Sequence, residues 1–194
     1  MKHALLALAL ALGTSTAAQA AAAPIASWSC TAGITGCSFA GDGAFPDEWQ
    51  YWQTDTAWWT GFADSVTYTL SAPSAIGGLT VSLDNNDSYV IEGSLDGNDW
   101  TTMLFVGAFN GNVGGGMDTF STIASDPFYD ASVAATFNPM TASLVRITSV
   151  DGDALNSVGE LALAAVPEPS AWMLMAAGLA GLGLARRRGL APRR

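Results

Sequence analysis

Carboxylates are the only side chains in most of this sequence that could perform acid–base chemistry. The one histidine, His3, and the one lysine, Lys2, stand among the first residues. No Ser-His-Asp or Cys-His arrangement, histidine zinc site or Schiff-base lysine can therefore form in the rest of the chain. Two carboxylates could act as in a glycosidase, but most Asp and Glu stand beside Gly, Asn or Pro in predicted turns, and no pair stands out. We predict that the protein is not an enzyme, with a carboxylate-dependent glycosidase or polysaccharide lyase as the alternative.

Charge is divided unevenly along the chain. Residues 21–165 contain 16 of the 17 Asp and Glu but a single basic residue, Arg146, so this body has a net charge of −15. Five arginines follow the last apolar run, and the whole-chain value of −10 conceals the division. Because nucleic-acid binding depends on Lys and Arg that neutralise phosphates, the composition excludes nucleic acid as a partner.

Aromatic residues are concentrated in the segment 39–62. Sugar rings stack on aromatic faces, so four residues here are candidates for a carbohydrate platform: Trp49, Tyr51, Trp58 and Trp59. Large aromatics are also common in cores, and we assign that role to Trp52 and Trp100. The pair Trp58 and Trp59 stays open between the two roles, because adjacent strand residues face opposite ways.

Alternating apolar and polar residues predict an all-β body. Alternation covers 66–70 and 79–83, a hairpin is predicted from 89–95 and 100–106, and the remaining strands are predicted at 120–123, 133–137, 144–150 and 159–165. Pro73 is expected to end the first of these strands, and five glycines predict a mobile loop over 107–118. The body has no convincing amphipathic helix. About eight short strands joined by Gly, Asn and Asp turns predict an antiparallel β-sandwich.

Three segments of the body match the pattern of a known family. Residues 89–100 read Tyr-Val-Ile-Glu-Gly-Ser-Leu-Asp-Gly-Asn-Asp-Trp, residues 144–147 read Leu-Val-Arg-Ile, and residues 159–161 read Gly-Glu-Leu. In this order they resemble the hairpin and the last two strands of discoidin, or coagulation-factor type C, domains. Asp42-Gly43 and residues 52–54 loosely match an early segment of the same family. The resemblance implies a galactose-binding-like jelly roll that often binds glycans or membrane surfaces.

The same resemblance implies one structural calcium ion. Asp42 and Glu160 match acidic positions of the family and would be its ligands, which suits calcium because it prefers hard oxygen ligands. The alternative is that both are solvated carboxylates on a turn or an edge strand. The family's glycan-binding residues lie on variable loops and are not transferred to this chain.

The last residues, 166–194, have three parts. Pro167-Glu168-Pro169 breaks regular structure, the apolar run 171–185 carries no charge, and a cluster of arginines follows. A helix over the run would measure about 22 Å against a hydrocarbon core of roughly 30 Å, a mismatch that local thinning or snorkelling can absorb. We therefore predict a transmembrane helix at 171–185 with the arginines on the cytoplasmic side.

This tail closely resembles the PEP-CTERM sorting signal of Gram-negative bacteria. The residues that carry the resemblance are Val166, Pro167, Glu168, Pro169, Arg186, Arg187 and Arg188. It implies recognition by a membrane protease-transpeptidase, an exosortase, in cells that produce exopolysaccharide, biofilms or flocs. The alternative is an ordinary C-terminal anchor with a proline-containing linker.

The N-terminus predicts a secretory signal peptide. A short positive region precedes the apolar residues 4–13, and Ala18-Gln19-Ala20 has the form of a cleavage site. The chain thus divides into a signal peptide (1–20), an exported body (21–165) and a sorting tail (166–194). In an exported body Cys30 and Cys37 are expected to form a disulfide, with metal binding as the weaker alternative.

Together these features predict an exported surface protein. We expect its body to lie in the periplasm, anchored in the inner membrane, until sorting moves it to the cell surface or the extracellular matrix. There it would bind or associate with exopolysaccharide or another glycan.

Overall fold

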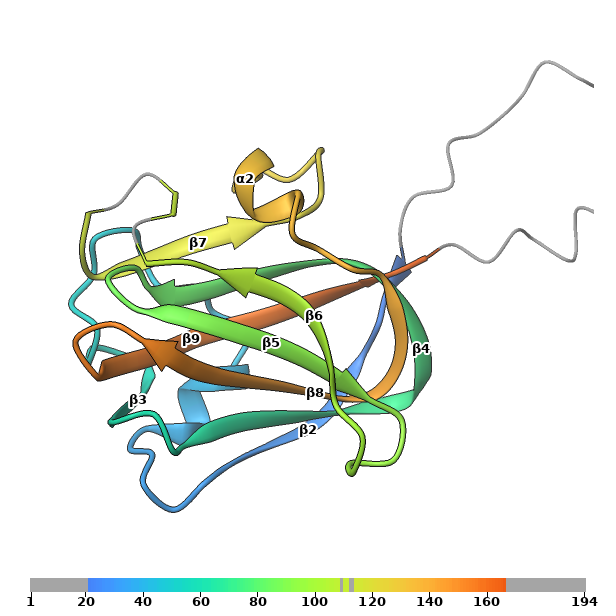
Figure 1. Ribbon diagram of the computed structural model, residues 1–194, viewed down its shortest axis with the longest axis horizontal. Coiled ribbons are helices and arrows are strands. Elements are labelled where there is room, and N and C mark those ends of the chain that lie inside the picture. The colour runs from blue at the N-terminus through green and yellow to red at the C-terminus, as the bar shows by residue number, and fades with distance from the viewer. Residues whose placement is uncertain (1–20, 109, 112–113, 167–194) are drawn as a thin grey trace, which may run out of the picture. The chain divides into compact units, whose positions relative to one another are not determined.

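The alternating segments of the sequence form nine β-strands (Figure 1). The structure is a computed structural model that describes residues 21–108, 110–111 and 114–166. Its strands are β1 (Ala21–Ala22), β2 (Ile25–Cys30), β3 (Ala57–Thr60), β4 (Ser65–Asp84), β5 (Ser88–Ser94), β6 (Thr101–Val106), β7 (Met117–Ser121), β8 (Met140–Asp151) and β9 (Leu155–Ala165). A 3-10 helix, η2 (Cys37–Gly41), and a short α-helix, α2 (Ala131–Ala134), complete the elements of this part.

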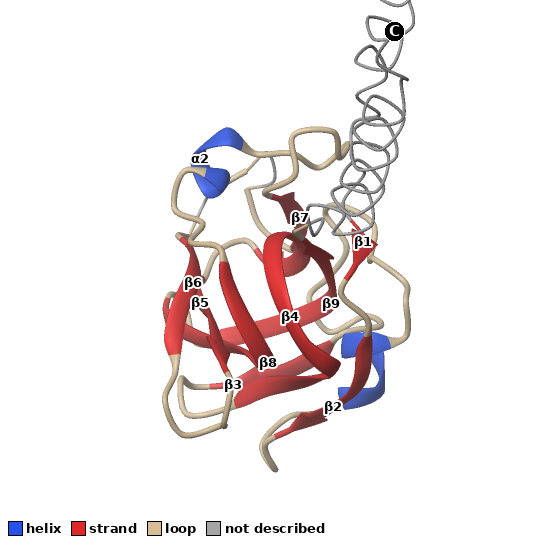
Figure 2. Ribbon diagram, turned by 90° about the vertical axis from the view of Figure 1, so that its right-hand side faces the viewer, coloured by secondary structure: helices blue, strands red, loops and turns tan. Residues whose placement is uncertain are grey.

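The long strand β4 belongs to both layers of an antiparallel β-sandwich. Its first part pairs with β2 and β8, and β8 continues the first layer through β5 to β6. Its second part pairs with β7 and β9 in the other layer, where β9 also pairs with β3 and β1. Figure 2 shows β4, β8 and β5 side by side in the first layer. All-β architecture and antiparallel pairing are confirmed.

The core lies between the layers and follows the period-two pattern of the strands. The buried apolar residues of β4 recur at alternate positions: Val66, Tyr68, Leu70, Leu79, Val81 and Leu83. Apolar residues of β5, β8 and β9 meet them from the other strands, including Ile91, Val145, Ile147 and Leu161. Each such side chain contributes on the order of 1.5–3 kcal/mol on burial, so the sandwich depends mainly on this interior.

The segment 42–56 covers the outer face of the second layer. An ideal Cβ on Gly159 of β9 would lie 2.4 Å from Cγ of Pro46, so only glycine permits this approach. Further along, the backbone of Trp49 and Gln50 pairs with Met117: Trp49 N donates to Met117 O and Met117 N to Gln50 O, both at 2.9 Å. The aromatic segment is thereby fixed beside the start of β7.

Two sequence predictions about local structure are corrected. Residues 133–137 do not form a strand, because α2 occupies 131–134. The Asp130 side chain starts this helix by accepting hydrogen bonds from Ser132 N at 2.7 Å and Val133 N at 3.0 Å, the usual role of an N-cap aspartate. Pro73 does not end a strand either: β4 continues through it, and the ladder to β8 only shifts register between Thr69 and Ser74. A bulge can hold a residue that has no N–H.

The two ends of the sandwich differ in character. At one end β1 pairs with the last residues of β9, Ala21 opposite Ala165. At the other end lie the turns 85–87 and 152–154, the segment 49–56 and residues 114–116, on the left in Figure 1; we call this the loop end. A disulfide joins Cys30 to Cys37, with the two Cα atoms 6.0 Å apart, as predicted.

Several predicted features lie outside the described residues. These are the signal peptide (1–20), the transmembrane helix (171–185) and most of the sorting motif, including Pro167, Glu168, Pro169, Arg186, Arg187 and Arg188. Among the residues that the structure describes, no helix is long and apolar enough to cross a membrane. The body, Ala21–Val166, forms a compact unit by itself.

Candidate functional site

A pocket opens at the loop end of the sandwich. It has a volume of about 410 Å³ and is lined by Trp49, Tyr51, Trp52, Asp84, Asn86, Gly114, Gly115, Gly116 and Asp153. We call it the loop-end pocket. Its aromatic residues come from one segment, and its polar residues come from the β4–β5 and β8–β9 turns, which antiparallel pairing brings to the same end.

The aromatic side of the loop-end pocket is open to solvent. The side chains of Trp49 and Tyr51 are 64% and 60% exposed, which is high for residues of this size. Trp52 is half-buried, and its ring meets Tyr51 at 5.9 Å and Trp58 edge-on at 5.5 Å between centroids. Trp58 therefore supports Trp52, and Trp52 in turn supports the exposed ring of Tyr51.

The polar side is built from residues with fixed orientations. Asn86 Nδ2 donates to Asp153 Oδ2 at 2.8 Å, and Leu155 N donates to Asp153 Oδ1 at 2.9 Å. Asp84 lies deeper, with only 2% of its surface exposed. Burial, together with the negative charges of Asp87 and Asp153, raises the pKa of the Asp84 carboxyl to about 7.

The glycines of the loop-end pocket let the backbone approach its neighbours. Gly116 has φ 78°, and an ideal Cβ there would lie 2.7 Å from Gln50 O. Gly114 and Gly115 have nothing within 4 Å of such a Cβ, so they border open space. The pocket thus offers exposed aromatic faces beside carboxylate and amide groups, a combination that can stack on a ring and bond hydroxyl groups around it.

The structure separates the four aromatic candidates. Trp49 and Tyr51 line the loop-end pocket, whereas Trp58 supports it from behind. Trp59 is fully buried and meets Tyr89 edge-on at 6.5 Å, so its place as a candidate ligand contact is corrected to a core position. The alternation of β3 explains this, because neighbouring strand residues face opposite ways.

Sequence reasoning missed the polar side of the loop-end pocket. Asp84, Asn86 and Asp153 stand in segments that the sequence identifies only as turns. The signal was present, because strands of similar length in an antiparallel sheet place alternate turns at the same end. Trp52, assigned to the core, is half-buried and also lines the pocket.

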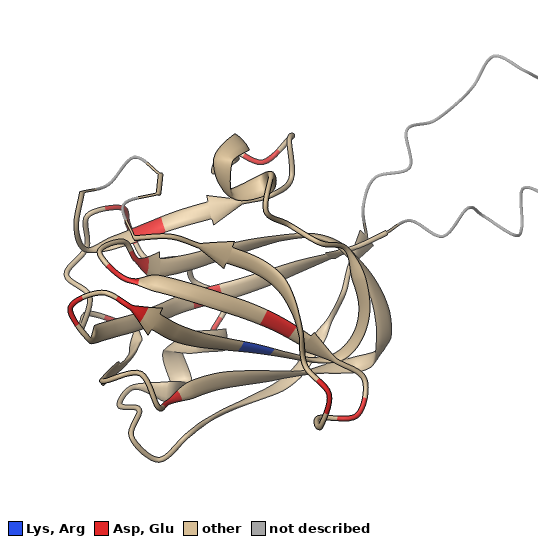
Figure 3. Ribbon diagram, viewed as in Figure 1, with Lys and Arg blue, Asp and Glu red and all other residues tan. Residues whose placement is uncertain are grey.

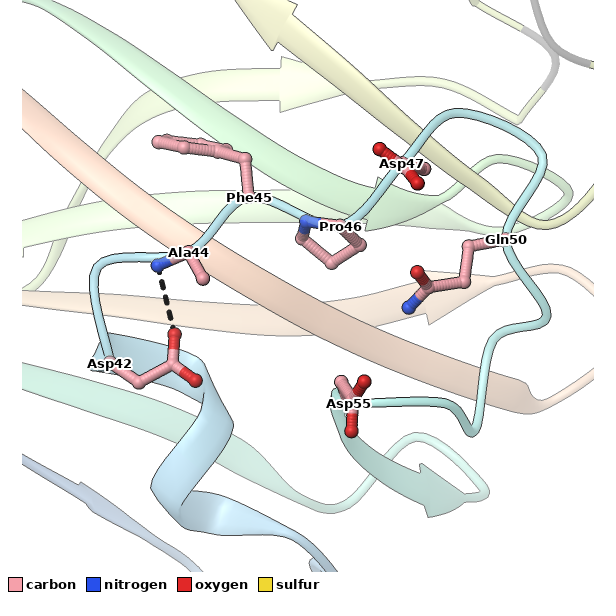
Figure 4. Close-up of a pocket in the computed structure, with 7 residues that line it drawn as sticks. All are labelled: Asp42, Ala44, Phe45, Pro46, Asp47, Gln50 and Asp55. Atoms are coloured by element: carbon pink, nitrogen blue, oxygen red, sulfur yellow. Dashed lines mark hydrogen bonds between the residues drawn. The ribbon is translucent and has the colours of Figure 1, made fainter.

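The two predicted calcium ligands lie close together on the outer face of the second layer. Glu160 is buried, and its Oε2 and Oε1 accept hydrogen bonds from Gly43 N at 2.5 Å and Leu161 N at 2.9 Å. Asp42 is exposed, and its Oδ1 accepts from Ala44 N at 2.9 Å (Figure 4). Burial raises the pKa of Glu160, and the charge of Asp42 adds to the rise.

These contacts give a partial fit to calcium. Two hard-oxygen side chains meet here, but both oxygens of Glu160 already accept main-chain N–H groups. In the described part of the chain, no three His, Cys, Asp or Glu side chains are grouped so that they could hold a metal. Calcium at Asp42 and Glu160 therefore stays a prediction from the resemblance.

The single basic residue of the body lies away from the loop-end pocket. Arg146 Nη2 bonds Glu92 Oε2 at 2.6 Å on the outer face of the first layer. Figure 3 shows it in β8, while several acidic residues lie in the turns of the loop end. The carboxylates of the pocket consequently receive no compensating charge from Lys or Arg of residues 21–166.

Comparison with solved structures defines the class of fold. The family 32 carbohydrate-binding module (CBM32) of AlyQ, solved with 4,5-unsaturated mannuronic acid, has a TM-score of 0.51 and 13% identity, covering 74% of this chain and 97% of that one. Truncated AlyQ, with its CBM32 and alginate lyase domains, has a TM-score of 0.51 and 14% identity, covering 78% of this chain and 35% of that one. The body has the discoidin-like β-sandwich of CBM32 modules, as the resemblance predicts.

The tail is defined by its sequence. Residues 165–188 match the PEP-CTERM protein-sorting motif, so the predicted sorting signal is confirmed. Its second residue, Val166, is the last residue of the body that the structure describes, and its backbone N–H donates to Ala75 O at 2.7 Å. A search of curated protein sequences gives no significant match.

Proposed function

We propose that this protein is an exported glycan-binding protein, sorted through its C-terminal motif and bound to exopolysaccharide outside the cell. The observation that carries the proposal is the loop-end pocket, where the exposed rings of Trp49 and Tyr51 stand beside Asn86 and Asp153. A sugar ring would stack its C–H face on the aromatics and direct its hydroxyl groups to the polar side.

The sorting motif and the fold support this proposal from two directions. A PEP-CTERM motif indicates export and processing at the membrane, which we attribute to an exosortase-type enzyme. The fold is that of modules which in AlyQ are solved with a sugar acid. The loop end lies opposite to the end of the sandwich where β1 pairs with the last residues of β9 (Figure 1), so a body tethered through its tail could still present the loop-end pocket.

Charge bears on the kind of glycan. A body of net charge −15 repels polyanions over about 10 Å at moderate salt, and the polar side of the pocket is itself acidic. We therefore propose neutral, hydroxyl-rich polysaccharide as the ligand.

Retention on purified exopolysaccharide tests the proposal. The full-length chain should be retained, and Trp49→Ala and Tyr51→Ala should each weaken binding about tenfold or more, because stacking on one ring contributes on the order of 1–3 kcal/mol. Tyr129→Ala is the matched control, since Tyr129 is 43% exposed but lies outside the pocket. Equal retention of all variants would refute the proposed site. Release of new reducing ends would instead indicate a carboxylate-dependent glycosidase.

A further inference from the structure

Two acidic side chains at the β4–β5 turn are buried without a basic partner, because Arg146, the single basic residue of 21–166, pairs with Glu92 instead. Asp84, the last residue of β4, is 2% exposed, and Asp87, just before β5, is 1% exposed. Asp151 and Asp153 of the facing turn add negative charge nearby rather than positive. Burying an ionised carboxylate without a partner costs several kcal/mol, so something must offset these charges.

Polar atoms in this turn also lack hydrogen-bond partners. Among the described residues, neither Oδ1 of Asp84, nor either Oδ of Asp87, nor either side-chain polar atom of Asn85 makes a hydrogen bond of good geometry. Main-chain N–H groups face both carboxylates, those of Asn85 and Gly116 at Asp84 and those of Asp153 and Ala154 at Asp87. They lower the pKa of each carboxyl by less than burial raises it. Buried polar groups in folded proteins are nearly always paired, so this concentration of unpaired oxygens points to a bound group.

We infer that the loop-end pocket binds a divalent cation of the calcium class, held by the carboxylates of Asp84 and Asp87. Asp84 lines the pocket, so a cation can reach it from solvent. Calcium accepts six to eight oxygens, including amide, main-chain and water oxygens, and therefore does not require a third carboxylate. A site with two carboxylates belongs to the weak class typical of extracellular modules, with Kd of about 0.1–1 mM.

The turn facing the site is shaped to admit Asp87. An ideal Cβ on Gly152 would lie 1.9 Å from Asp87 Oδ1, and Gly152 has φ 130°. Only glycine at this position leaves room for the carboxylate. The arrangement is distinct from the pair Asp42 and Glu160, which lies against η2 and β9.

Calcium titration of the full-length chain after chelator treatment tests the inference. At a hundredfold excess of calcium over Kd, the melting temperature should rise by about 5–10 °C. The double variant Asp84→Asn/Asp87→Asn should show no such rise and should melt no lower than the wild type without calcium, since it removes buried charge. Asp99→Asn, which removes an exposed carboxylate of the β5–β6 turn, should respond as the wild type does.

Terbium provides a second readout that is independent of stability. Tb³⁺ replaces calcium on oxygen ligands and luminesces when nearby tryptophans are excited, and Trp49 and Trp52 line the same pocket. The luminescence should be displaced by calcium and absent from the double variant. Near-ultraviolet circular dichroism confirms that each variant is folded.

Three outcomes would overturn the inference. No thermal or luminescence response in the wild type would mean that protons alone neutralise Asp84 and Asp87. A response kept by the double variant would place the cation elsewhere, and its loss in Asp42→Asn would assign it to the pair Asp42 and Glu160. The cation site does not depend on glycan binding, because calcium titration is carried out without glycan. Failure of one therefore leaves the other standing.

Discussion

The guanidinium of Arg146 lies 4.2 Å above the ring centroid of Trp100. The same group bonds Glu92 Oε2 through Nε at 3.1 Å and Nη2 at 2.6 Å, so one cation joins the hairpin of β5 and β6 to the outer face of β8. Arg146 is half-buried, and its ion pair with Glu92 gives it a structural role on this face.

Removing Arg146 should destabilise the body. Arg146→Ala loses the stacking on Trp100 and leaves Glu92 unpaired, which should lower the free energy of unfolding by about 1–3 kcal/mol. Arg146→Lys keeps the charge but not the planar group, so its free energy of unfolding should lie between those of Arg146→Ala and the wild type. Urea denaturation measures both, with Thr148→Ala on the same face of β8 as the control. A loss in Arg146→Ala no greater than in the control would contradict the prediction.

Gly116→Ala should damage the loop-end pocket more than Gly115→Ala. Gly116 has φ 78°, where a side chain costs about 1–2 kcal/mol, and its Cβ would also clash with Gln50 O. The Cβ of Gly115→Ala would meet nothing within 4 Å. Gly116→Ala should lower both the free energy of unfolding and glycan retention. Gly115→Ala should leave the free energy of unfolding unchanged. Equal loss of stability in both would show that the loop rearranges freely.

Without divalent cations the body should become less stable as the pH rises. Burial raises the pKa of Asp84 to about 7 and of Asp87 to about 6, against about 3.9 in the unfolded chain. The folded state therefore binds more protons than the unfolded state between these values. Its extra stability is complete below about pH 4 and is lost as the pH rises through 6 and 7. The negative charge of Asp153 contributes to the raised pKa of both carboxyls, and that of Asp151 contributes to the raised pKa of Asp87.

Urea denaturation with chelator at several pH values measures this effect. From pH 5 to pH 8 the free energy of unfolding should fall on the order of 2–4 kcal/mol. Asp84→Asn/Asp87→Asn should flatten the profile, and Asp99→Asn should not. Burial also raises the pKa of Glu160, which leaves a smaller slope of the same sign in the double variant. A wild-type profile that is flat or rises with pH would contradict the prediction.

Glu168→Ala should block processing of the sorting tail without affecting the body. Glu168 belongs to the matched sorting motif and not to the compact unit Ala21–Val166 that forms the body. Full-length protein should then accumulate in the inner membrane, measured by fractionation and mass spectrometry. Glu48→Ala, which removes an exposed glutamate of the body, is the control. If Glu168→Ala reached the cell surface with wild-type mass and yield, the tail would act as an ordinary anchor.

Alternation and turn residues were enough to predict the sandwich, because a half-buried strand leaves a period of two in the sequence. The same signals wrongly predicted a strand at 133–137, because the helix that Asp130 caps there is too short to show helical periodicity. The pocket was predicted only on its aromatic side. Trp49 and Trp59 look alike in sequence. Trp59 is buried because it stands at an inward-facing position of β3, whereas Trp49 is exposed in the irregular segment 42–56. Asp84 and Asp87 read as turn residues, because burial at a strand end has no local signature.

The placement of β9 has a mechanical consequence. This strand runs from the β8–β9 turn, which supplies Asp153 to the loop-end pocket, to Ala165, just before the tail. Its hydrogen bonds to β4 lie across the strand direction. Tension between a ligand in the pocket and a tethered tail would therefore pull along β9 and load those bonds together in shear, instead of opening them one at a time. Under such a load the β4–β9 ladder would have to break as a whole before the body unfolds.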